Sequence, residues 1–284
     1  MVRRYELSDE AFGLIEDLLP PNGQRGGQWN DHRITLNGIF WILHTGAQWR
    51  ELPERYGKWK SVYDRYNRWR KDGTIDRMLE RLHLKLDEQG RIDMDLWCID
   101  ATQIRASRAA AGARRGKKVA GEPADHALGR SRGGYGTKLH VVVDSHGIPI
   151  SAAISAGQRH ESKFVEPVLR PVRLVRPGTQ GGRPRTKPRR LTGDKGYSYP
   201  AVCRYLRQRG IRAVIPTRKD QRRNPRFDTI TYRRRNIVER VVGWLKENRR
   251  LATRYEKLAV NFLAMVKLAM IQRCLRLLDS SDRA

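Results

Sequence analysis

The sequence predicts a mixed α/β fold that is preceded by a small all-helical region. As far as about residue 85 the chain follows helical spacing with short breaks, and no strand is apparent. From residue 93 onward the periodicity changes to that of strands, and short strands then alternate with helices. That order is typical of a mixed α/β layer architecture. A chain of 284 residues accommodates two domains, which we place at 1–88 and 89–284.

Four helices are expected in the N-terminal region. Ser8 or Asp9 caps the first helix, and Pro20-Pro21 ends it after Leu19. Glycine and proline breaks separate the other three, which are expected at about 33–45, 58–71 and 74–86.

The third of these helices combines an aromatic stripe with basic residues. The stripe follows helical spacing, and we interpret it as core packing: Trp59, Val62, Tyr63, Tyr66 and Trp69. Lys and Arg side chains occupy the remaining surface of this helix. Since a helix-turn-helix module offers one helix to a DNA groove, we expect 1–88 to be a helix-turn-helix-like DNA-binding domain.

The second region is expected to begin with three strands and to continue with alternating helices and strands. The strands are predicted at 95–100, 138–144 and 148–155, followed by a short strand that ends near Gly193 and one at 211–216. A turn at Ser145-His146-Gly147 joins the second and third strands as a hairpin. Helices are predicted at 161–172, 200–209, 232–246 and 258–278. Residues 106–134 and 173–189 are rich in Arg, Lys and Gly, and we interpret them as mobile loops that face nucleic acid.

The charge balance points to a polyanionic partner. The formal net charge is +28, and 58 Lys and Arg residues are spread along the chain, so nucleic acid is the expected partner. Cys98, Cys203 and Cys274 are isolated, which argues against a zinc site or a disulfide framework. No signal peptide or membrane-spanning run is visible, so we expect a cytoplasmic protein. Without a Gly-rich phosphate loop or a Ser-His-Asp order, nucleotide hydrolysis and acyl transfer have no support.

One predicted helix carries a single acid among bases. At about 100° per residue, Tyr232, Arg235, Glu239 and Lys246 fall within a stripe of about 60°, opposite an apolar side. A face of this kind needs a ligand or solvent. The alternative interpretation is a solvated basic face on which Glu239 forms surface ion pairs of little energetic value.

Three carboxylates are placed as candidates for a metal site. Asp100 ends the first predicted strand, Asp194 follows the fourth, and Glu239 lies on the polar face of the helix just described. Mg²⁺ is held by a few carboxylates and keeps water and substrate phosphate in its shell. Ligands of open sheets usually bind at strand ends, so these positions suit phosphoryl chemistry.

Other polar residues have simpler interpretations. Asp144 fits the chemistry of the hairpin turn, and Glu247 fits a solvated partner of nearby arginines. His140 on an alternating strand and His160 before a helix are more typical of packing and capping than of catalysis.

Three segments resemble the DDE transposases of bacterial insertion sequences, in the group with a Tyr-Arg-Glu-Lys signature. They are Ile99-Asp100-Ala101-Thr102, Gly193-Asp194-Lys195-Gly196-Tyr197, and the series Tyr232, Arg235, Glu239 and Lys246. The resemblance covers most of the chain. It implies an RNase H-like catalytic domain at 89–284 and a helical domain ahead of it.

The resemblance also implies a site and an activity. Asp100, Asp194 and Glu239 would be the catalytic residues and would bind two Mg²⁺ ions, with Mn²⁺ as a substitute. Tyr232, Arg235 and Lys246 would contact DNA of the transposon ends. The implied reaction is DNA end cleavage followed by strand transfer, by two-metal phosphoryl transfer.

The implied partners are double-stranded DNA, from both the transposon ends and the target, and a homodimer or higher oligomer in the synaptic complex. The implied location is the bacterial nucleoid. About 45 residues separate Asp194 from Glu239, so the large β insertion of some relatives is absent, which disfavours a hairpin intermediate. The alternatives are an RNase H-like nuclease without strand transfer and a non-catalytic, DNA-binding transposase relic.

Overall fold

The N-terminal region is helical, as predicted. The structure, a computed structural model, describes residues 5–21, 28–113, 119–174, 184–222 and 224–279. The helices of this region are α1 (Asp9–Gly13), α2 (His32–Thr45), α3 (Trp59–Lys71) and α4 (Thr74–Glu88). Ser8 caps α1 by accepting the Ala11 N–H, and Gly46 closes α2 in the left-handed conformation that glycine favours.

The first helix is shorter than predicted. It ends at Gly13, and a separate 3₁₀ turn covers Glu16–Leu18. Gly13 is the poorest helix former in this stretch, and the turn after it places Ile15 fully inside the core. The break therefore agrees with the low helix propensity of Gly13, and it also allows Ile15 to be buried.

The aromatic stripe of α3 packs into the core, which confirms its interpretation. Val62, Tyr66 and Trp69 are buried. The Tyr66 hydroxyl donates a hydrogen bond of 2.6 Å to the carbonyl oxygen of Asn261. Asn261 lies on α11 (Ala259–Leu278), so this bond joins the helical region to the last helix of the chain.

A mixed sheet forms the second region and confirms the predicted α/β class. Its main strands run in the order β4, β3, β1, β5, β6. The first three, β1 (Leu96–Ala106), β3 (Gly134–Asp144) and β4 (Pro149–Ala156), pair antiparallel. The other two, β5 (Arg190–Thr192) and β6 (Arg212–Val214), pair parallel with β1 and with each other. The β3–β4 hairpin lies where the sequence predicted it.

The first strand is longer than predicted, and the prediction that it ends at Asp100 is wrong. β1 continues to Ala106 and stays in register with β3 as far as the pair of Arg105 with Gly136. Residues after Asp100 are more polar, so their alternation is weak in the sequence. The strand nevertheless persists because β3 supplies a partner along its whole length, opposite Asp100 at Val141.

The two segments interpreted as loops contain some structure. The first holds α5 (Arg108–Ala111) and β2 (Gly129–Ser131), and β3 begins earlier than predicted. In the second, Leu174 pairs with Arg185. Residues 114–118 and 175–183 of these loops lie outside the described residues, so their predicted mobility stays a prediction.

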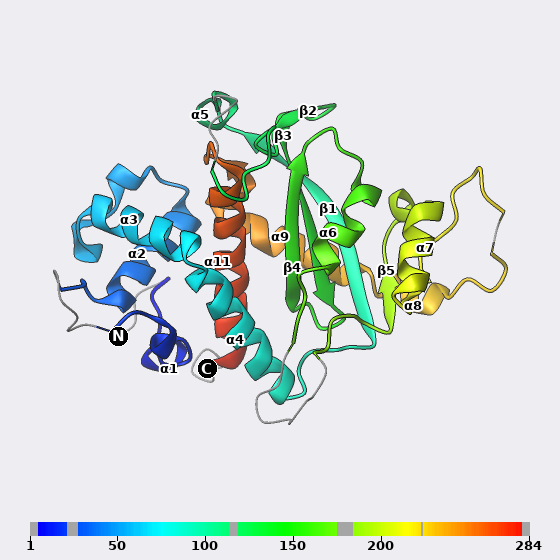
Figure 1. Ribbon diagram of the computed structural model, residues 1–284, viewed down its shortest axis with the longest axis horizontal. Helices are drawn as coiled ribbons and strands as arrows, with labels where there is room; N and C mark the ends of the chain where they lie inside the picture. The colour runs from blue at the N-terminus through cyan, green and yellow to red at the C-terminus, as the bar shows by residue number, and fades with distance from the viewer. Residues whose placement is uncertain (1–4, 22–27, 114–118, 175–183, 223, 280–284) are drawn as a thin grey trace.

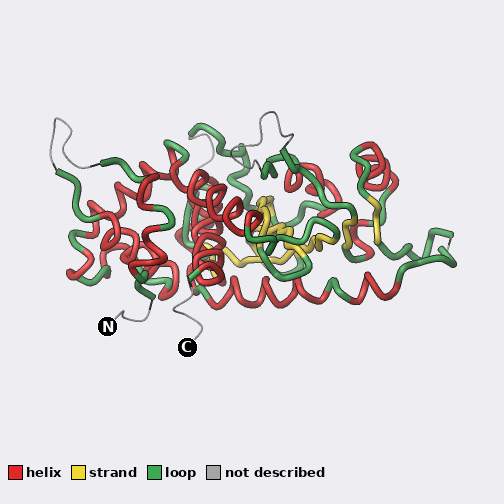
Figure 2. Tube along the Cα trace, turned by 90° about the horizontal axis from the view of Figure 1, so that it is seen from below, coloured by secondary structure: helices red, strands yellow, loops and turns green. Residues whose placement is uncertain are grey.

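Two further predictions need correction. The helix expected at 161–172 is a 3₁₀ turn (Glu161–Phe164) followed by the short α6 (Val165–Leu169), and Pro171 cannot extend it. The helix expected at 232–246 is divided into α8 (Thr229–Arg233) and α9 (Asn236–Glu247). At the junction the backbone makes three-residue turns, with Val238 N–H donating to the Arg235 carbonyl. Figure 2 shows the two helices end to end along one side of the sheet.

The remaining elements complete the layers around the sheet. They are α7 (Pro200–Gln208), α10 (Arg249–Ala252) and β7 (Thr253–Arg254), the last two of which were not predicted. α9 packs on β1 and β3 from one face, and α6 packs on β3 and β4 from the other (Figure 1). α11 lies between the helical region and β4 and packs along α4. None of the described helices is long and apolar enough to cross a membrane.

Candidate active site

Strand pairing brings Asp100 and Asp194 together. β1 and β5 are parallel, and their last pair in register is Cys98 with Thr192. Asp100 and Asp194 each lie two residues beyond that pair, where the two strands part. On β1, Cys98 and Asp100 point to the same face because side chains alternate along a strand. That face carries α9, since the Cys98 thiol approaches the Arg234 carbonyl oxygen.

The junction of α8 and α9 adds the third carboxylate through an arginine. The Arg235 guanidinium lies 3.6 Å from Oδ2 of Asp100 and donates a 2.5 Å hydrogen bond to Oε1 of Glu239. It also lies 5.8 Å from the centre of the Tyr232 ring. Arg235 is therefore held between the strand and the helix, and it links Asp100 to Glu239.

The charges of Asp194 and Glu239 both act on Asp100. Burial raises the pKa of Asp100, and the negative charges of Asp194 and Glu239 raise it further. The Ala101 N–H and the Arg235 charge act in the opposite direction. For Arg235, burial lowers the pKa, but the charges of Asp100 and Glu239 outweigh burial and raise it. The single positive charge of Arg235 thus faces two carboxylates, those of Asp100 and Glu239.

Sequence reasoning missed two residues at this site. The Tyr197 ring is fully buried, and its hydroxyl has no hydrogen-bond partner among the described residues. Burial raises its pKa, as do the charges of Asp100, Glu161 and Asp194. Glu161 is a fourth acid, 3.7 Å from the Lys138 ammonium. Tyr197 belongs to the segment that carries the resemblance, whereas no pattern in the sequence marks Glu161.

The donor set fits a divalent cation in chemistry and charge but is not preassembled around one. Carboxylate oxygens are the ligands that Mg²⁺ prefers, and their mutual repulsion at Asp100 would be relieved by a cation. In the described parts of the chain, however, no three His, Cys, Asp or Glu side chains form a group that could hold a metal ion. The Arg235 guanidinium occupies the position between Asp100 and Glu239, so an ion would require Glu239 to leave Arg235.

The other predicted site residues are placed as follows. Tyr232 ends up on α8 and next to Arg235, although the chain bends between them. Lys246 lies two turns beyond Glu239, in the last turn of α9, and is partly buried. Asp194 also caps the 3₁₀ turn that follows it, because its Oδ1 accepts the Gly196 N–H at 2.9 Å.

The simpler interpretations of His140, His160 and Asp144 are confirmed, whereas Glu247 is exposed and forms no ion pair with an arginine among the described residues. His140 is buried, stacks on Phe164 and contacts the Ser155 hydroxyl. His160 caps the 3₁₀ turn after it by accepting the Ser162 N–H. The Asp144 carboxylate is buried in the hairpin turn, where it accepts backbone N–H groups. The three cysteines are free thiols.

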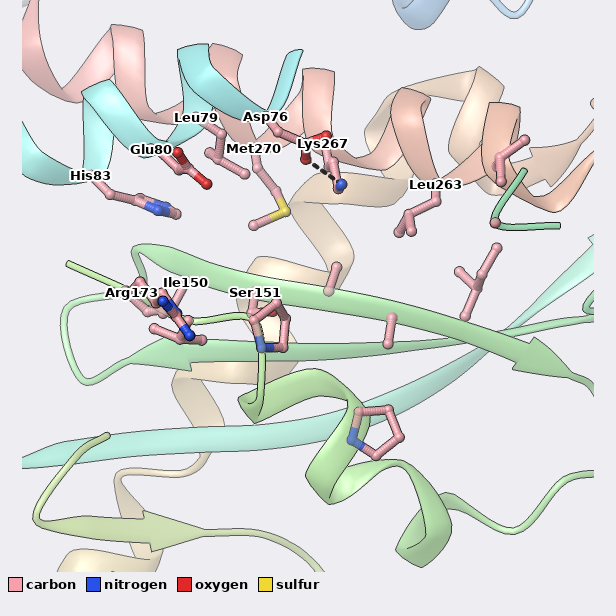
Figure 3. A pocket seen from close by; sticks show the side chains of 18 of the residues that line it. Asp76, Leu79, Glu80, His83, Ile150, Ser151, Arg173, Leu263, Lys267 and Met270 are labelled. Carbon is pink, nitrogen blue, oxygen red and sulfur yellow. Dashed lines mark hydrogen bonds and ion pairs between the residues drawn. The ribbon is translucent and has the colours of Figure 1, made fainter. Parts of the chain in front are cut away.

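An apolar recess lies away from these acids. A cavity of about 440 Å³ opens between α4, α11 and β4, with the Asp76–Lys267 ion pair at one side (Figure 3). None of Asp100, Asp194 and Glu239 lines it. Asp100 and Asp194 are instead partly exposed and Glu239 is exposed, as suits a macromolecular substrate that lies across the surface.

Comparison with known families matches both parts of the chain. Residues 7–79 match the family model "Putative transposase of IS4/5 family (DUF4096)", and residues 92–272 match the model "Transposase DDE domain". The second match covers well over half of the chain.

Curated relatives agree with these matches. The chain is 30% identical over 149 residues to "Putative transposase for insertion sequence element IS402" from Burkholderia cepacia, covering 52% of this chain and 67% of that protein. It is 37% identical over 113 residues to "Uncharacterized protein y4sN" from Sinorhizobium fredii, covering 39% and 85%.

Among solved structures, the Mos1 mariner paired end complex with Mn shares 13% identity at a TM-score of 0.26, covering 84% of this chain and 83% of that one. A TM-score this low supports no inference about the chain.

Proposed function

The chain belongs to the DDE transposases of insertion sequences, since the DDE domain model spans residues 92–272, and we propose that it binds the terminal inverted repeats of its element and catalyses DNA end cleavage and strand transfer. We further propose that Asp100, Asp194 and Glu239 are the catalytic residues.

One observation carries this assignment. Three carboxylates from separate elements, far apart in the sequence, come together: Asp100 and Glu239 both contact Arg235, and Asp194 follows the strand that pairs with the strand of Asp100. Burying a charge next to like charges costs folding free energy, so a purely structural role does not account for Asp100. The arrangement is what a site for a bound cation and a phosphate requires.

The proposed cofactor is a pair of Mg²⁺ ions, with Mn²⁺ as a substitute. Asp100, Asp194 and Glu239 would hold them through carboxylate oxygens. Bound divalent ions supply Lewis acidity, which lowers the pKa of an attacking water or 3′-hydroxyl and stabilises the leaving oxygen.

The basic side chains would position the DNA. Arg235, once released from Glu239, would pair with a backbone phosphate, and Tyr232 beside it would pack against the sugar-phosphate chain. Lys246 would contact a phosphate further along α9. In the first reaction a water oxygen would bond to phosphorus and the 3′-oxygen would leave. In the second, the freed 3′-hydroxyl oxygen would bond to a phosphorus of target DNA, and the target strand's own 3′-oxygen would leave and take up a proton. Arg235 and Lys246 would keep the two strands in line for both reactions.

The helical region would recognise the ends. We propose that 1–88 is a helix-turn-helix-like DNA-binding domain and that 89–284 is the catalytic domain. Tyr232, Arg235 and Lys246 would hold the terminal DNA beside the catalytic acids, so that the two domains act on the same DNA end. Two ends must meet in one complex, so we propose a homodimer or larger oligomer, acting on the nucleoid in the bacterial cytoplasm.

The test uses a supercoiled plasmid that carries the element with its own flanking repeats. With Mg²⁺, the wild-type protein should release the ends and join them to a second plasmid. The Glu239→Gln variant should bind the ends and lose both products, because the amide cannot replace a charged ligand. Retained Mg²⁺-dependent cleavage by Glu239→Gln would overturn the site assignment.

The matched control is Glu247→Gln on the same helix. Glu247 is exposed and two turns from Glu239, so both products should persist. Cleavage without joining by the wild type would favour a nuclease, and end binding without either product would favour a relic.

A further inference from the structure

A second recess lies between the helical region and the start of α11. Its volume is about 560 Å³, and none of the three proposed catalytic acids lines it. Aromatic side chains from the helical region and from the segment after β7 form its walls: Trp49, Trp59, Tyr63, Tyr66 and Tyr255. The Tyr66 hydroxyl is not available as a donor to a ligand, because it donates a hydrogen bond to the Asn261 carbonyl oxygen. Tyr255 is 39% exposed, so this wall of the recess reaches the surface.

Two buried acceptors in this recess have unused capacity. Glu256 and Asn261 line it and are only 7% and 9% exposed. Oε1 of Glu256 accepts a 2.6 Å hydrogen bond from Nε of Arg250, whereas its Oε2 is buried and has no hydrogen-bond partner among the described residues. The side-chain oxygen of Asn261 is in the same situation. Leaving buried acceptors unpaired costs stability, so the recess is suited to a ligand that brings N–H donors.

The charge of the recess argues against a cationic ligand. Arg250 pairs with Glu256 and lies 5.2 Å from the Tyr255 ring centre, and Lys257 also lines the recess. These positive groups would repel an ammonium that sought the aromatic walls. A flat, neutral ring with N–H donors meets all the conditions, because it can stack on aromatic side chains and donate to both oxygens.

We propose that this recess binds an unstacked nucleobase that carries an exocyclic amino group. The ring would lie among the aromatic walls, and the amino group would donate to Glu256 and Asn261. Adenine, cytosine and guanine carry such a group, whose two N–H donors match the two oxygens, whereas unpaired thymine offers only its single ring N3–H. No bond forms or breaks in this step.

The position of the recess supports DNA as the source, an inference that rests on the proposed function. β7 immediately precedes Tyr255 in the chain. It pairs with the end of β1 at Arg105 and Ala106, beyond Asp100. Six residues of strand separate Asp100 from Ala106, which is roughly 20 Å. DNA held at the carboxylates would thus present nucleotides near the recess, and an unpaired base could turn into it.

The first experiment measures the recess without duplex DNA. Equilibrium dialysis of the full chain against dAMP, dCMP, dGMP and dTMP holds the phosphate constant and varies only the base. We expect dTMP to bind about tenfold more weakly than the others. Tyr255→Ala and Asn261→Leu should each reduce the binding of the three amino-bearing nucleotides to the dTMP level. Equal binding of all four nucleotides would overturn the proposal.

The second experiment places the base in DNA. Duplexes with one bulged dA should bind about tenfold more tightly than the fully paired duplex, and duplexes with one bulged dT should not. Tyr255→Ala should remove that advantage and leave the paired duplex within about twofold. Tyr205→Ala, a partly exposed tyrosine on α7, is the matched control and should retain it. A bulge advantage that persists in Tyr255→Ala would exclude this recess.

The two proposals fail separately. If nucleotides bind selectively but no plasmid is cleaved, the recess stands and the transposition activity does not. If plasmids are cleaved and joined but nucleotides bind without selectivity, the recess proposal alone is wrong.

Discussion

Asp100 and Asp144 lie on paired strands of one sheet, and burial raises the pKa of both, yet they are bonded differently. The Asp144 carboxylate accepts N–H groups from Asp93, His146 and Ile148, at 2.8 to 3.0 Å. Among the described residues Asp100 accepts one N–H, from Ala101, and otherwise faces Arg235 at 3.6 Å.

The difference separates a structural acid, Asp144, from a proposed catalytic acid, Asp100. Asp144 uses its lone pairs to accept N–H groups that close a hairpin turn, so its hydrogen-bonding capacity serves the fold. Asp100 keeps lone pairs unused and is surrounded by the like charges of Asp194 and Glu239. A raised pKa alone does not distinguish the two residues; the number of donors around each carboxylate does.

The largest expected effect comes from Asp100→Asn. We expect end cleavage to fall at least ~10³-fold, because a neutral amide cannot serve as a charged ligand in the transition state. The free energy of unfolding should stay constant or rise slightly, since the variant removes a repelled charge. Plasmid cleavage and urea denaturation measure the two quantities.

Asp144→Asn should show the opposite behaviour. Its amide group would leave at least one buried N–H without an acceptor, so we expect a loss of about 2 kcal/mol of stability. Cleavage per folded molecule should be retained. If Asp144→Asn abolished cleavage at full stability, or Asp100→Asn merely unfolded the protein, the distinction between these acids would be wrong.

Much of the fold and the candidate acids could be predicted from the sequence. The features that depend on contacts between distant segments could not. The hairpin, the helices α2, α3, α4, α7 and α11, and the choice of candidate acids follow from periodicity and local spacing. The extension of β1 beyond Asp100 could not be predicted, because β3 rather than local propensity sustains it. Glu161 was equally invisible: it reaches the site only because its 3₁₀ turn packs beside the turn that follows Asp194. Contacts between distant segments leave no local pattern.

His140 tests whether a perturbed pKa can be purely structural. It pairs with Ala101 next to Asp100, and burial, aided by the Lys138 charge, lowers its pKa to about 3. The unfolded chain binds a proton near the ordinary value of 6.5, so the unfolded state gains protons first as the pH falls. This residue should therefore lower the free energy of unfolding by about 2 kcal/mol as the pH falls from 7 to 5.

His140→Gln should remove that contribution without changing cleavage per folded molecule at pH 7. Burial lowers the pKa of His83 to about 4, so His83 should add a similar contribution. A variant with both His140→Gln and His83→Gln should show the weakest pH dependence of the free energy of unfolding. Denaturation curves at several pH values measure it. An unchanged slope in His140→Gln would show that the residue does not control acid stability.

Arg235→Ala tests the role of the guanidinium beside Asp100. We expect it to change metal affinity and DNA cleavage in opposite directions. Removing a guanidinium 3.6 Å from Asp100 leaves the acids without their cation, so Mn²⁺ should bind about tenfold more tightly to the free protein. End binding and cleavage should weaken, because the DNA loses a cationic partner for one phosphate. Electron spin resonance of free Mn²⁺ gives the affinity. Weaker Mn²⁺ binding would mean that Arg235 organises the acids rather than occupying their position.

Lys246→Ala should give the smallest effect. Lys246 lies on α9 beyond Glu239, and removing its ammonium from one DNA phosphate should weaken DNA binding about fivefold at moderate salt. The slope of log affinity against log salt should fall by about one, equally for all sequences. Lys267→Ala is the control, because that ammonium pairs with Asp76 in the apolar recess and should leave the slope unchanged. An unchanged slope in Lys246→Ala would place this lysine with the solvated surface charges, and the functional face would then end at Glu239.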